Sequence, residues 1–326
     1  MTMRRRHLLG GAAAALATAF PALALAQGEW PQRPVRLVVP FPPGGGTDAT
    51  SRLVADRLNI AMGWTMVIDN KPGAGGNIGI SETVRAPKDG YTLLLSSGGA
   101  ITINPMIYSK LAFNPEKDLT PVAAVARVHV FLETNPAVPA TNVAEFIKHL
   151  KANPGKLSYG SPGQGSSPHL AGEMFKRMAG VDAVHAPYKG AGPALSDVLS
   201  GQLQFWFDPG PGLKQVEAGK LRLLAIGSPH RSPQYPNVPT LAESGLPGFD
   251  ADTLFGIYAP TGTPESVIEA VRTAVAKALE QKNVNDVILT LGATPAPLSR
   301  KAFIDHHATE RERFGELVKA IGLKVD

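Results

Sequence analysis

Short apolar segments that end in turn residues recur along the chain. Such segments are typical of strands buried in a parallel sheet. We expect seven of them, at 35–41, 65–70, 91–97, 156–161, 183–188, 203–208 and 221–227. Segments with apolar residues at helical spacing lie between them, such as Leu53, Val54, Leu58 and Ala61 before Gly63. The alternation of strands and helices predicts an α/β fold with mostly parallel, doubly wound sheets.

The pattern also repeats within the chain. A strand, a Pro/Gly-rich loop and an amphipathic helix follow one another in the same order in both halves. The matching pairs are 37–58 with 157–178, 67–84 with 184–201, and 91–104 with 203–216. All six loops follow strands, and ligands of open parallel sheets bind beyond the carboxyl ends of strands. Two such units that face each other would form one cleft for a small molecule.

Two further segments, 126–140 and 251–265, resemble each other and lie where the chain would cross between the units. Helical patterns follow the second crossing. We therefore expect a discontinuous first domain of residues 27–127 and 253–326 and a second domain of residues 128–252. Two crossing strands make a hinge, and a hinge suits closure around a ligand in the cleft.

Residues 1–26 have the pattern of a secretory signal peptide. Three arginines, Arg4 to Arg6, precede an alanine-rich apolar stretch, and Ala24 to Ala26 form a small-x-small cleavage site. Pro21 and the moderate hydropathy of this stretch disfavour a membrane anchor. Sec and twin-arginine export both remain open, since the arginine pair lacks the full twin-arginine pattern. We expect an exported protein.

Composition narrows the chemistry. The chain has 32 Lys and Arg against 27 Asp and Glu, and three of those arginines belong to the leader, so little net charge remains after cleavage. No basic run with interleaved aromatic residues remains, and we do not expect nucleic acid as a partner. The absence of cysteine excludes disulfides, thiolate nucleophiles and Cys–zinc sites. We expect a monomer without metal or cofactor.

The first glycine cluster has the spacing of a dinucleotide-binding loop. Gly44, Gly46 and Ala49 fit G-x-G-x-x-A, and Asp69 lies near the position of a ribose-binding acid. Prolines at 40, 42 and 43, however, separate the strand from the first glycine, and proline cannot donate to a strand ladder. A single G-x-G-x-x-A match is weak, and a small anion is the better hypothesis.

The loops share backbone N–H groups at the starts of predicted helices. Gly44 to Thr47, Gly73 to Asn77, Gly163 to Ser167 and Gly190 to Gly192 could each direct such donors at a carboxylate or phosphate. Hydroxyl groups of Thr47, Ser97, Ser161, Ser166 and Ser167 add donors. Ordinary N-caps and tight turns would explain any one loop alone. Two opposed helix ends, one in each unit, favour a ligand with two separated anionic groups.

Catalytic interpretations have less support. An exported serine hydrolase could use Ser166 or Ser167 with His169, but no G-x-S-x-G elbow surrounds them. We interpret His169 as a capping or packing residue, and His306, His307 and Glu310 as a solvated helix face. Asp208 is either a turn residue or a partner for an amino or hydroxyl group. Trp206 and Phe207 are expected in the core, and Lys189 either neutralises an anion or forms a salt bridge.

These motifs resemble a known family across almost the whole chain. The sequence is similar to the substrate-binding proteins of tripartite tricarboxylate transporters, the Bug (Bordetella uptake gene) family of periplasmic receptors. The resemblance lies in "PFPPGGGTD" (40–48), "NKPGAGGNIG" (70–79), "DGYTLL" (89–94), "YGSPGQGSSPHLAGE" (159–173), "PYKGAGPAL" (187–195), "GKLRLLAIGSPHR" (219–231), "PNVPTLAESGLPGF" (236–249) and "YAPTGTP" (258–264).

The resemblance implies two doubly wound α/β domains joined by a two-strand hinge, as in the type II periplasmic binding proteins. Such a receptor would capture an organic acid by flytrap closure and deliver it to the integral-membrane subunits of a transporter. The ligand would be a di- or tricarboxylate, an acidic amino acid or an aromatic acid, held largely by backbone amides, with no catalysis. Contacts carried over by position are Gly45, Gly46, Thr47, Asp48, Gly75, Gly76, Asn77 and Ser97 in the first domain, and Ser161, Gly165, Ser166, Ser167, Tyr188, Lys189, Gly190 and Asp208 in the second.

Overall fold

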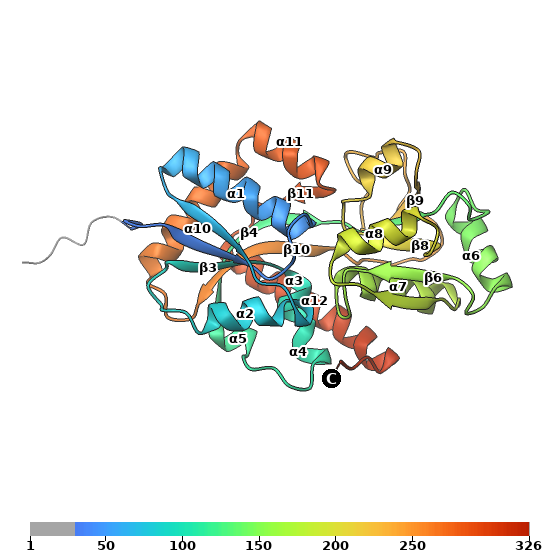
Figure 1. The fold of residues 1–326 in the computed structure, drawn as a ribbon, viewed down its shortest axis with the longest axis horizontal. Coiled ribbons are helices and arrows are strands. Elements are labelled where there is room, and N and C mark those ends of the chain that lie inside the picture. The colour runs from blue at the N-terminus through green and yellow to red at the C-terminus, as the bar shows by residue number, and fades with distance from the viewer. Residues whose placement is uncertain (1–29, 326) are drawn as a thin grey trace, which may run out of the picture. The chain divides into compact units, whose positions relative to one another are not determined.

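The computed structural model describes residues 30–325, and the predicted leader, 1–26, lies outside them. Residues 33–325 belong to one compact unit. Within residues 33–325 the strands form two sheets (Figure 1). The first has the order β11–β4–β10–β3–β1–β2. Its strands are β1 (Val35–Val39), β2 (Met66–Asn70), β3 (Thr92–Ser97), β4 (Leu119–Val128), β10 (Thr253–Pro260) and β11 (Ala293–Pro295).

The second sheet repeats the arrangement of the first. Its order is β7–β6–β8–β5–β9. Its strands are β5 (Phe131–Thr134), β6 (Ser158–Ser161), β7 (Val184–Pro187), β8 (Phe205–Asp208) and β9 (Arg222–Ile226). In both sheets three parallel strands, β2–β1–β3 or β7–β6–β8, are followed by one antiparallel strand, β10 or β5. The α/β fold, the seven predicted strands and the internal repeat are confirmed.

Helices connect the strands. We call residues 33–128 and 253–325 the first lobe and residues 129–252 the second lobe. The first lobe contains α1 (Gly46–Met62), η1 (Ala74–Gly76), α2 (Asn77–Val84), α3 (Gly98–Thr102), α4 (Asn104–Ile107), α5 (Pro115–Asp118), α10 (Glu265–Leu279), α11 (Lys282–Thr290) and α12 (Arg300–Ile321). The second contains α6 (Val143–Ala152), α7 (Ser167–Ala179), α8 (Ala191–Leu199) and α9 (Leu213–Glu217). Figure 1 shows α1 and α10 on one face of the first sheet and α2 and α12 on the other.

Local sequence explains where the helices that border the loops begin and end. α1 ends where Gly63 adopts the left-handed conformation, with φ of 66°, and the Gly63 N–H donates to Asn59 O. α7 begins at the Ser166 cap, carries Pro168 in its first turn and ends at Gly180 with φ of 62°. These capping residues fix the positions at which loops pass into helices.

The core of the second lobe includes residues from the end of α12. Phe314, Leu317 and Val318 belong to the same buried cluster as Phe146 and Phe175, whose rings stack with their centroids 5.9 Å apart. The first half of α12 instead packs on β4 and α3 of the first lobe. One helix therefore contacts both lobes. The domain boundaries expected from the sequence remain a prediction, because the lobes belong to one compact unit.

One sequence interpretation of α12 is wrong. His307 and Glu310 do not lie on a solvated face: both are buried, and Glu310 accepts hydrogen bonds from Thr253 Oγ1 at 2.6 Å and Thr102 Oγ1 at 2.9 Å. His307 Nε2 lies 3.0 Å from Tyr258 Oη. The charged residues of α12 suggested exposure to solvent. The sequence did not show that this face packs against α3 and β10, because both elements are remote in sequence. Among the described residues no group of three or more His, Asp or Glu is placed to hold a metal ion.

A buried polar cluster lies where the chain crosses between the lobes. His129 follows β4, and Asp252 precedes β10. His129 Nδ1 lies 3.0 Å from Asp252 Oδ1 and 2.6 Å from Ser228 Oγ, and Ser228 Oγ donates to the same carboxylate. All three side chains are buried. The cluster ties both crossing segments to the end of the second lobe.

Replacing Asp252 tests this cluster. Asp252→Ala removes the buried carboxylate acceptor that both other side chains share and leaves them only each other as partners within the cluster, so we expect a loss of about 2 kcal/mol of unfolding free energy. Urea denaturation measures it. As a control, Asp305→Ala removes an exposed carboxylate that pairs with Lys301 within α12 and should cost less than about 0.5 kcal/mol. Equal losses in the two variants would contradict a structural role of the cluster.

Candidate functional site

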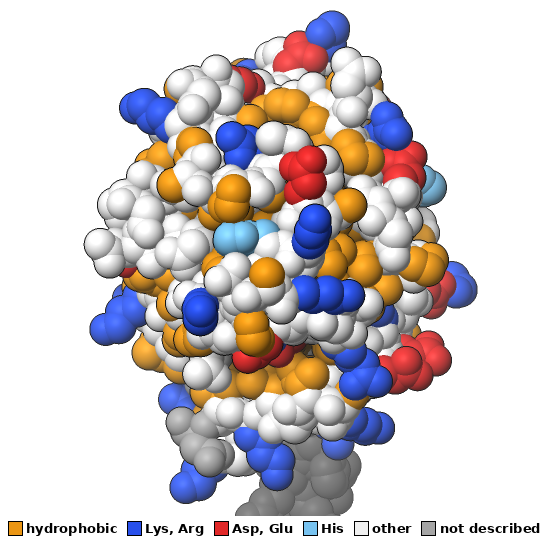
Figure 2. Space-filling model, turned by 90° about the vertical axis from the view of Figure 1, so that its right-hand side faces the viewer, with side chains coloured by type: hydrophobic (Ala, Val, Ile, Leu, Met, Phe, Trp, Pro, Cys, Tyr) orange, Lys and Arg blue, Asp and Glu red, His pale blue; other side chains and the backbone are white. Residues whose placement is uncertain are grey.

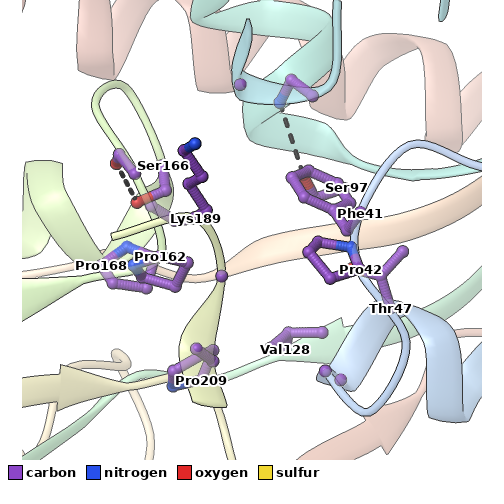
Figure 3. Close-up of a pocket in the computed structure, with 18 of the residues that line it drawn as sticks. Phe41, Pro42, Thr47, Ser97, Val128, Pro162, Ser166, Pro168, Lys189 and Pro209 are labelled. Atoms are coloured by element: carbon purple, nitrogen blue, oxygen red, sulfur yellow. Dashed lines mark hydrogen bonds between the residues drawn. The ribbon is translucent and has the colours of Figure 1, made fainter. Parts of the chain in front are cut away.

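A cavity of about 280 Å³ lies between the two lobes, where the six predicted loops meet. The first lobe contributes the loop after β1, from Phe41 to Thr47. It also contributes Gly75 after β2, and Ser97, Ala100 and Asn104 at and after the end of β3. The second lobe contributes the loops after β6, β7 and β8. Figure 3 shows Ser166 and Lys189 on one side, Ser97 and Thr47 on the other, and Val128 between them. The repeat thus places corresponding loops on opposite walls.

The first wall is built around the start of α1. Gly45 is the N-cap residue, and no side chain caps this helix end. The first backbone N–H groups of a helix have no partner within the helix, so those of Gly46 and Thr47 can donate to a ligand. Asp48 does not compete for them, because its carboxylate accepts from Gly44 N–H at 3.0 Å and from the Arg52 guanidinium at 3.0 Å. The helix dipole adds positive potential at this wall.

The second wall begins at α7. Ser166 Oγ donates to Gly163 O at 2.7 Å and accepts from His169 N–H at 3.4 Å. The Gly165 N–H, expected to be open to a ligand, donates instead to His169 Nδ1 at 3.0 Å. Ser167, which also lines the cavity, follows this cap. These hydrogen bonds fix the turn from Gly163 to Ser166. Fewer backbone N–H groups of this turn are therefore open to a ligand than the sequence suggested.

The start of α8 completes the second wall. Gly190 is its N-cap, again without a capping side chain, and the Gly190 N–H donates to Pro162 O at 3.0 Å. The following amides, of Ala191 and Gly192, belong to the uncapped first turn and line the cavity. Lys189, immediately before the helix, is the only charged side chain among the lining residues. The cavity is therefore electropositive without containing an arginine.

Two stacked histidines support the second wall from behind. The His169 and His185 rings are 3.9 Å apart and nearly parallel. Burial lowers the pKa of His169 to about 4 and that of His185 to about 3. His185 Nε2 lies 2.7 Å from Ser161 Oγ. Both rings are neutral at pH 7, as the acceptor role of His169 Nδ1 requires, and the expected capping or packing role of His169 is confirmed.

The two enzymatic alternatives find no matching geometry here. Ser166 Oγ bonds the backbone of His169 rather than its imidazole, which is already the acceptor for Gly165. A serine nucleophile instead needs an imidazole that takes its proton. Asp69, the candidate ribose ligand, is bound by Arg36 Nε at 2.7 Å and does not line the cavity. These residues have structural partners that account for their positions.

The predicted contact residues fall into two groups. Ten line the cavity: Gly45, Gly46, Thr47, Gly75, Ser97, Gly165, Ser166, Ser167, Lys189 and Gly190. Six are not among its lining residues: Asp48, Gly76, Asn77, Ser161, Tyr188 and Asp208. Several of the second group bond to residues of the walls, as Asn77 Oδ1 does by accepting from Asn104 Nδ2 at 2.7 Å. The assignment of all sixteen as ligand contacts remains a prediction.

Asp208 lies in a buried acidic pair. Its side chain and that of Glu133 are fully buried. Asp208 Oδ2 accepts from Gly212 N–H at 2.9 Å, and Glu133 Oε2 accepts from Trp206 Nε1 at 2.8 Å. Burial raises the pKa of both carboxyl groups, that of Asp208 to about 7, and the Asp208 charge raises that of Glu133 further. Such a pair retains a proton at neutral pH.

Comparison with known proteins agrees with this geometry. The family model described as "Tripartite tricarboxylate transporter family receptor" matches residues 50–323. The chain belongs to this family. The protein BugT of Bordetella pertussis is 36% identical over 99% of this chain and 100% of its own length. The Bug-family resemblance seen in the sequence is thereby confirmed.

Solved structures of periplasmic receptors have the same fold. "R. palustris Rpa4515 with adipate" is 36% identical, with a TM-score of 0.87, over 90% of this chain and 99% of that one. MatC (Rpa3494) of Rhodopseudomonas palustris with bound malate is 32% identical, with a TM-score of 0.82, over 88% of this chain and 99% of that one. These relatives of the tripartite tricarboxylate receptor family bind small carboxylates.

Several lining residues were missed by the sequence analysis. Val128 and Val130 flank the first crossing, and Thr253 and Phe255 belong to β10. Asn104, at the start of α4, also reaches the cavity. None of them lies in a glycine-rich loop. The only signal was the pair of crossing segments, which indicated a hinge but gave no reason to assign its side chains to the cavity.

The neutral histidines make the stability of the receptor sensitive to acid. In the unfolded chain both keep the ordinary histidine pKa of 6.5, so the unfolded state binds more protons and stability falls as pH drops from about 6.5 to 4. In a His169→Gln/His185→Gln double variant the free energy of unfolding should depend less steeply on pH. The slope should decrease by at most about 1.4 kcal/mol per pH unit for each histidine. Urea denaturation across this range measures it. The exposed His230→Gln control should keep the wild-type slope; an unchanged slope in the double variant would contradict the argument.

Asp208→Asn separates structure from ligand contact. Because the pKa of Asp208 is raised in the folded state, the free energy of unfolding of the wild type falls as pH rises from the ordinary 3.8 to about 7. The free energy of unfolding of Asp208→Asn, which lacks this carboxyl group, should therefore increase relative to that of the wild type over this interval. Asparagine keeps the acceptor for Gly212. Because Asp208 does not line the cavity, affinity should change less than about threefold, or about 0.7 kcal/mol. Denaturation and calorimetry check the two statements, with the exposed Asp182→Asn as control. A large loss of affinity with unchanged stability would restore Asp208 as a ligand contact.

Proposed function

We propose that this receptor captures a small organic carboxylate in the periplasm and delivers it to tripartite tricarboxylate-type subunits in the membrane. The observation that carries the proposal is the electropositive cavity. Lys189 is its only charged lining residue, and the uncapped starts of α1 and α8 lie on opposite walls. A carboxylate on either wall would accept from backbone amides with the helix dipole behind them.

The relatives support this ligand class. One structure with 36% identity contains adipate and another with 32% identity contains malate, and both are dicarboxylates. Organic acids of this size suit a cavity of about 280 Å³. The family resemblance also implied acidic amino acids and aromatic acids as ligands. The residues that line the cavity would determine which of these acids binds.

Contacts across the cavity suit closure of the two lobes around the ligand. A Cβ atom at Gly46 would lie 3.4 Å from Pro209 O, and one at Gly190 would lie 3.4 Å from Pro42 Cγ. Each glycine thus faces the other lobe. Closure would exclude water from the carboxylates and strengthen their hydrogen bonds. In this proposal the protein acts as a monomer, is exported by residues 1–26 and holds no cofactor. None of the described helices has the length and apolar character that a membrane-spanning segment needs.

The surface of the second lobe gives one indication about partners. Figure 2 shows basic, acidic and apolar side chains interspersed on this face, without a continuous basic band. A mixed surface suits a protein partner better than a polyanion. Delivery to the transporter is part of the proposal.

Mass spectrometry of ligands released from gently purified protein tests the function directly. We expect a di- or tricarboxylate or an aromatic acid. A thermal-shift screen of organic acids provides an independent measurement, since a ligand at 100 times its Kd stabilises by about 2.7 kcal/mol. A bound nucleotide would overturn the proposal. So would ester hydrolysis that disappears in Ser166→Ala, which would favour the serine hydrolase.

Gly46→Pro tests the role of the α1 amide. Proline is well tolerated at the first helical position but lacks the N–H, so the fold should persist while affinity for the acid falls at least about tenfold, the lower range for a hydrogen bond to a charged group. Gly46→Ala is the matched control, because it adds a Cβ but keeps the donor. Calorimetry with an acid found in the screen measures both.

The outcome separates three interpretations. Loss in Gly46→Pro alone supports the donor role, whereas equal losses in both variants would show that close approach to Pro209, rather than the N–H, is what matters. Asp69→Ala should bind normally, because its carboxylate pairs with Arg36 away from the cavity. Loss of binding in Asp69→Ala alone would restore the dinucleotide interpretation.

A further inference from the structure

The lining of the cavity has no negative side chain. Asp48 and Asp208, the acids closest in sequence to the lining loops, accept hydrogen bonds from Gly44 and Gly212 and do not line the cavity. An ammonium group on the ligand would therefore lose water without gaining a counter-charge, beside the positive Lys189. The cavity disfavours amino acids, although they are small carboxylates.

The polar side chains near the crossing strands already have partners. Asn104 Nδ2 donates to Gly75 O at 3.0 Å, in addition to its bond to Asn77. Thr253 Oγ1 donates to Glu310 at 2.6 Å. These bonds engage the donors of both side chains, so a hydroxyl group at the centre of the ligand would find no free donor on either of them, and a lone pair without a donor is costly when buried.

The surroundings of these partnered groups are apolar. The side chains of Phe41, Pro42, Val128, Val130 and Phe255 contribute to the lining. Figure 3 shows Val128 between the two walls, with Phe41 and Pro42 on the wall of the first lobe. An apolar chain or an aromatic ring between the acid groups would fit this environment.

Polar side chains without a hydrogen-bonded partner elsewhere in the described chain lie on the two walls. On the first wall, Thr47 adds its hydroxyl group to the amides of α1. On the second wall, Ser167 is the first residue of α7, and Lys189 comes immediately before the start of α8. Within residues 33–325 the Lys189 ammonium group makes no salt bridge, so its charge is available to a ligand. Each wall can thus hold one carboxylate.

We propose that the receptor selects dicarboxylates whose centre is unsubstituted or aromatic, discriminates strongly against 2-amino acids and less against hydroxy acids, and uses Lys189 to distinguish diacids from monoacids. This specificity rests on the proposed carboxylate-binding function. It follows from the carboxylate-free lining, the partnered Asn104 and Thr253, and the position of Lys189.

Matched ligands test the selectivity on the unmodified, ligand-free protein. The pairs are succinate with aspartate, glutarate with glutamate and adipate with 2-aminoadipate, together with malate beside succinate. For each length that binds, calorimetry should give at least about a 100-fold loss for the amino acid. We expect about a tenfold loss for the hydroxyl group of malate. An amino acid that binds as tightly as its parent diacid would overturn the inference while leaving the proposed function intact. Absence of binding by every acid would instead contradict the proposed function.

Lys189→Gln tests the second part. It should weaken binding of the best diacid about tenfold and leave the monoacid of the same length unchanged, because only the diacid reaches both walls. Lys220→Gln, an exposed lysine outside the cavity, is the matched control and should change neither affinity. Equal loss for diacid and monoacid in Lys189→Gln would show that Lys189 does not discriminate. Circular dichroism confirms that both variants are folded.

Discussion

Close approach of glycines in one lobe to residues of the other lobe is the constraint on which this structure depends. At Gly165 a Cβ atom would lie only 2.1 Å from Ile107 Cδ1 of the other lobe, and the residue has φ of 76°. Gly190 has φ of 130° and faces Pro42. Larger side chains at these positions would be strained and would hold the lobes apart. The glycines therefore allow helix starts on opposite walls to come within reach of one small molecule.

Backbone amides and burial determine the charge in and around the cavity more than ion pairs do. The cavity gains positive potential from amides at the starts of α1 and α8 and from one lysine. Behind the second wall, burial keeps His169 and His185 neutral, so that imidazole nitrogen can serve as an acceptor for the Gly165 turn. The Glu133–Asp208 pair is likewise kept partly protonated away from the lining. Negative charge is thus excluded from the place where an acid would bind.

Much of the fold could be predicted, because its signals are local. Apolar runs with turn residues gave the positions of seven strands, of which six pair in parallel and β9 pairs antiparallel with β5. The repeated order of loop and helix gave the correspondence between the two sheets. Serine and glycine caps gave the start of α7 and the end of α1. Ten of the sixteen expected contact residues line the cavity, since strand ends and helix starts follow from the same local pattern.

What the sequence by itself determined is the sheet-forming segments, the loops that carry backbone donors and the family. Only the tertiary structure decided which donors stay open, because the Gly165 amide is taken by His169 and the Gly190 amide by Pro162. It also decided that Glu310 is buried and that Phe255 and Val128 line the cavity. The physical reason is that these outcomes depend on partners distant in the chain. A residue's type states which bonds it can make, but packing determines which of them it does make.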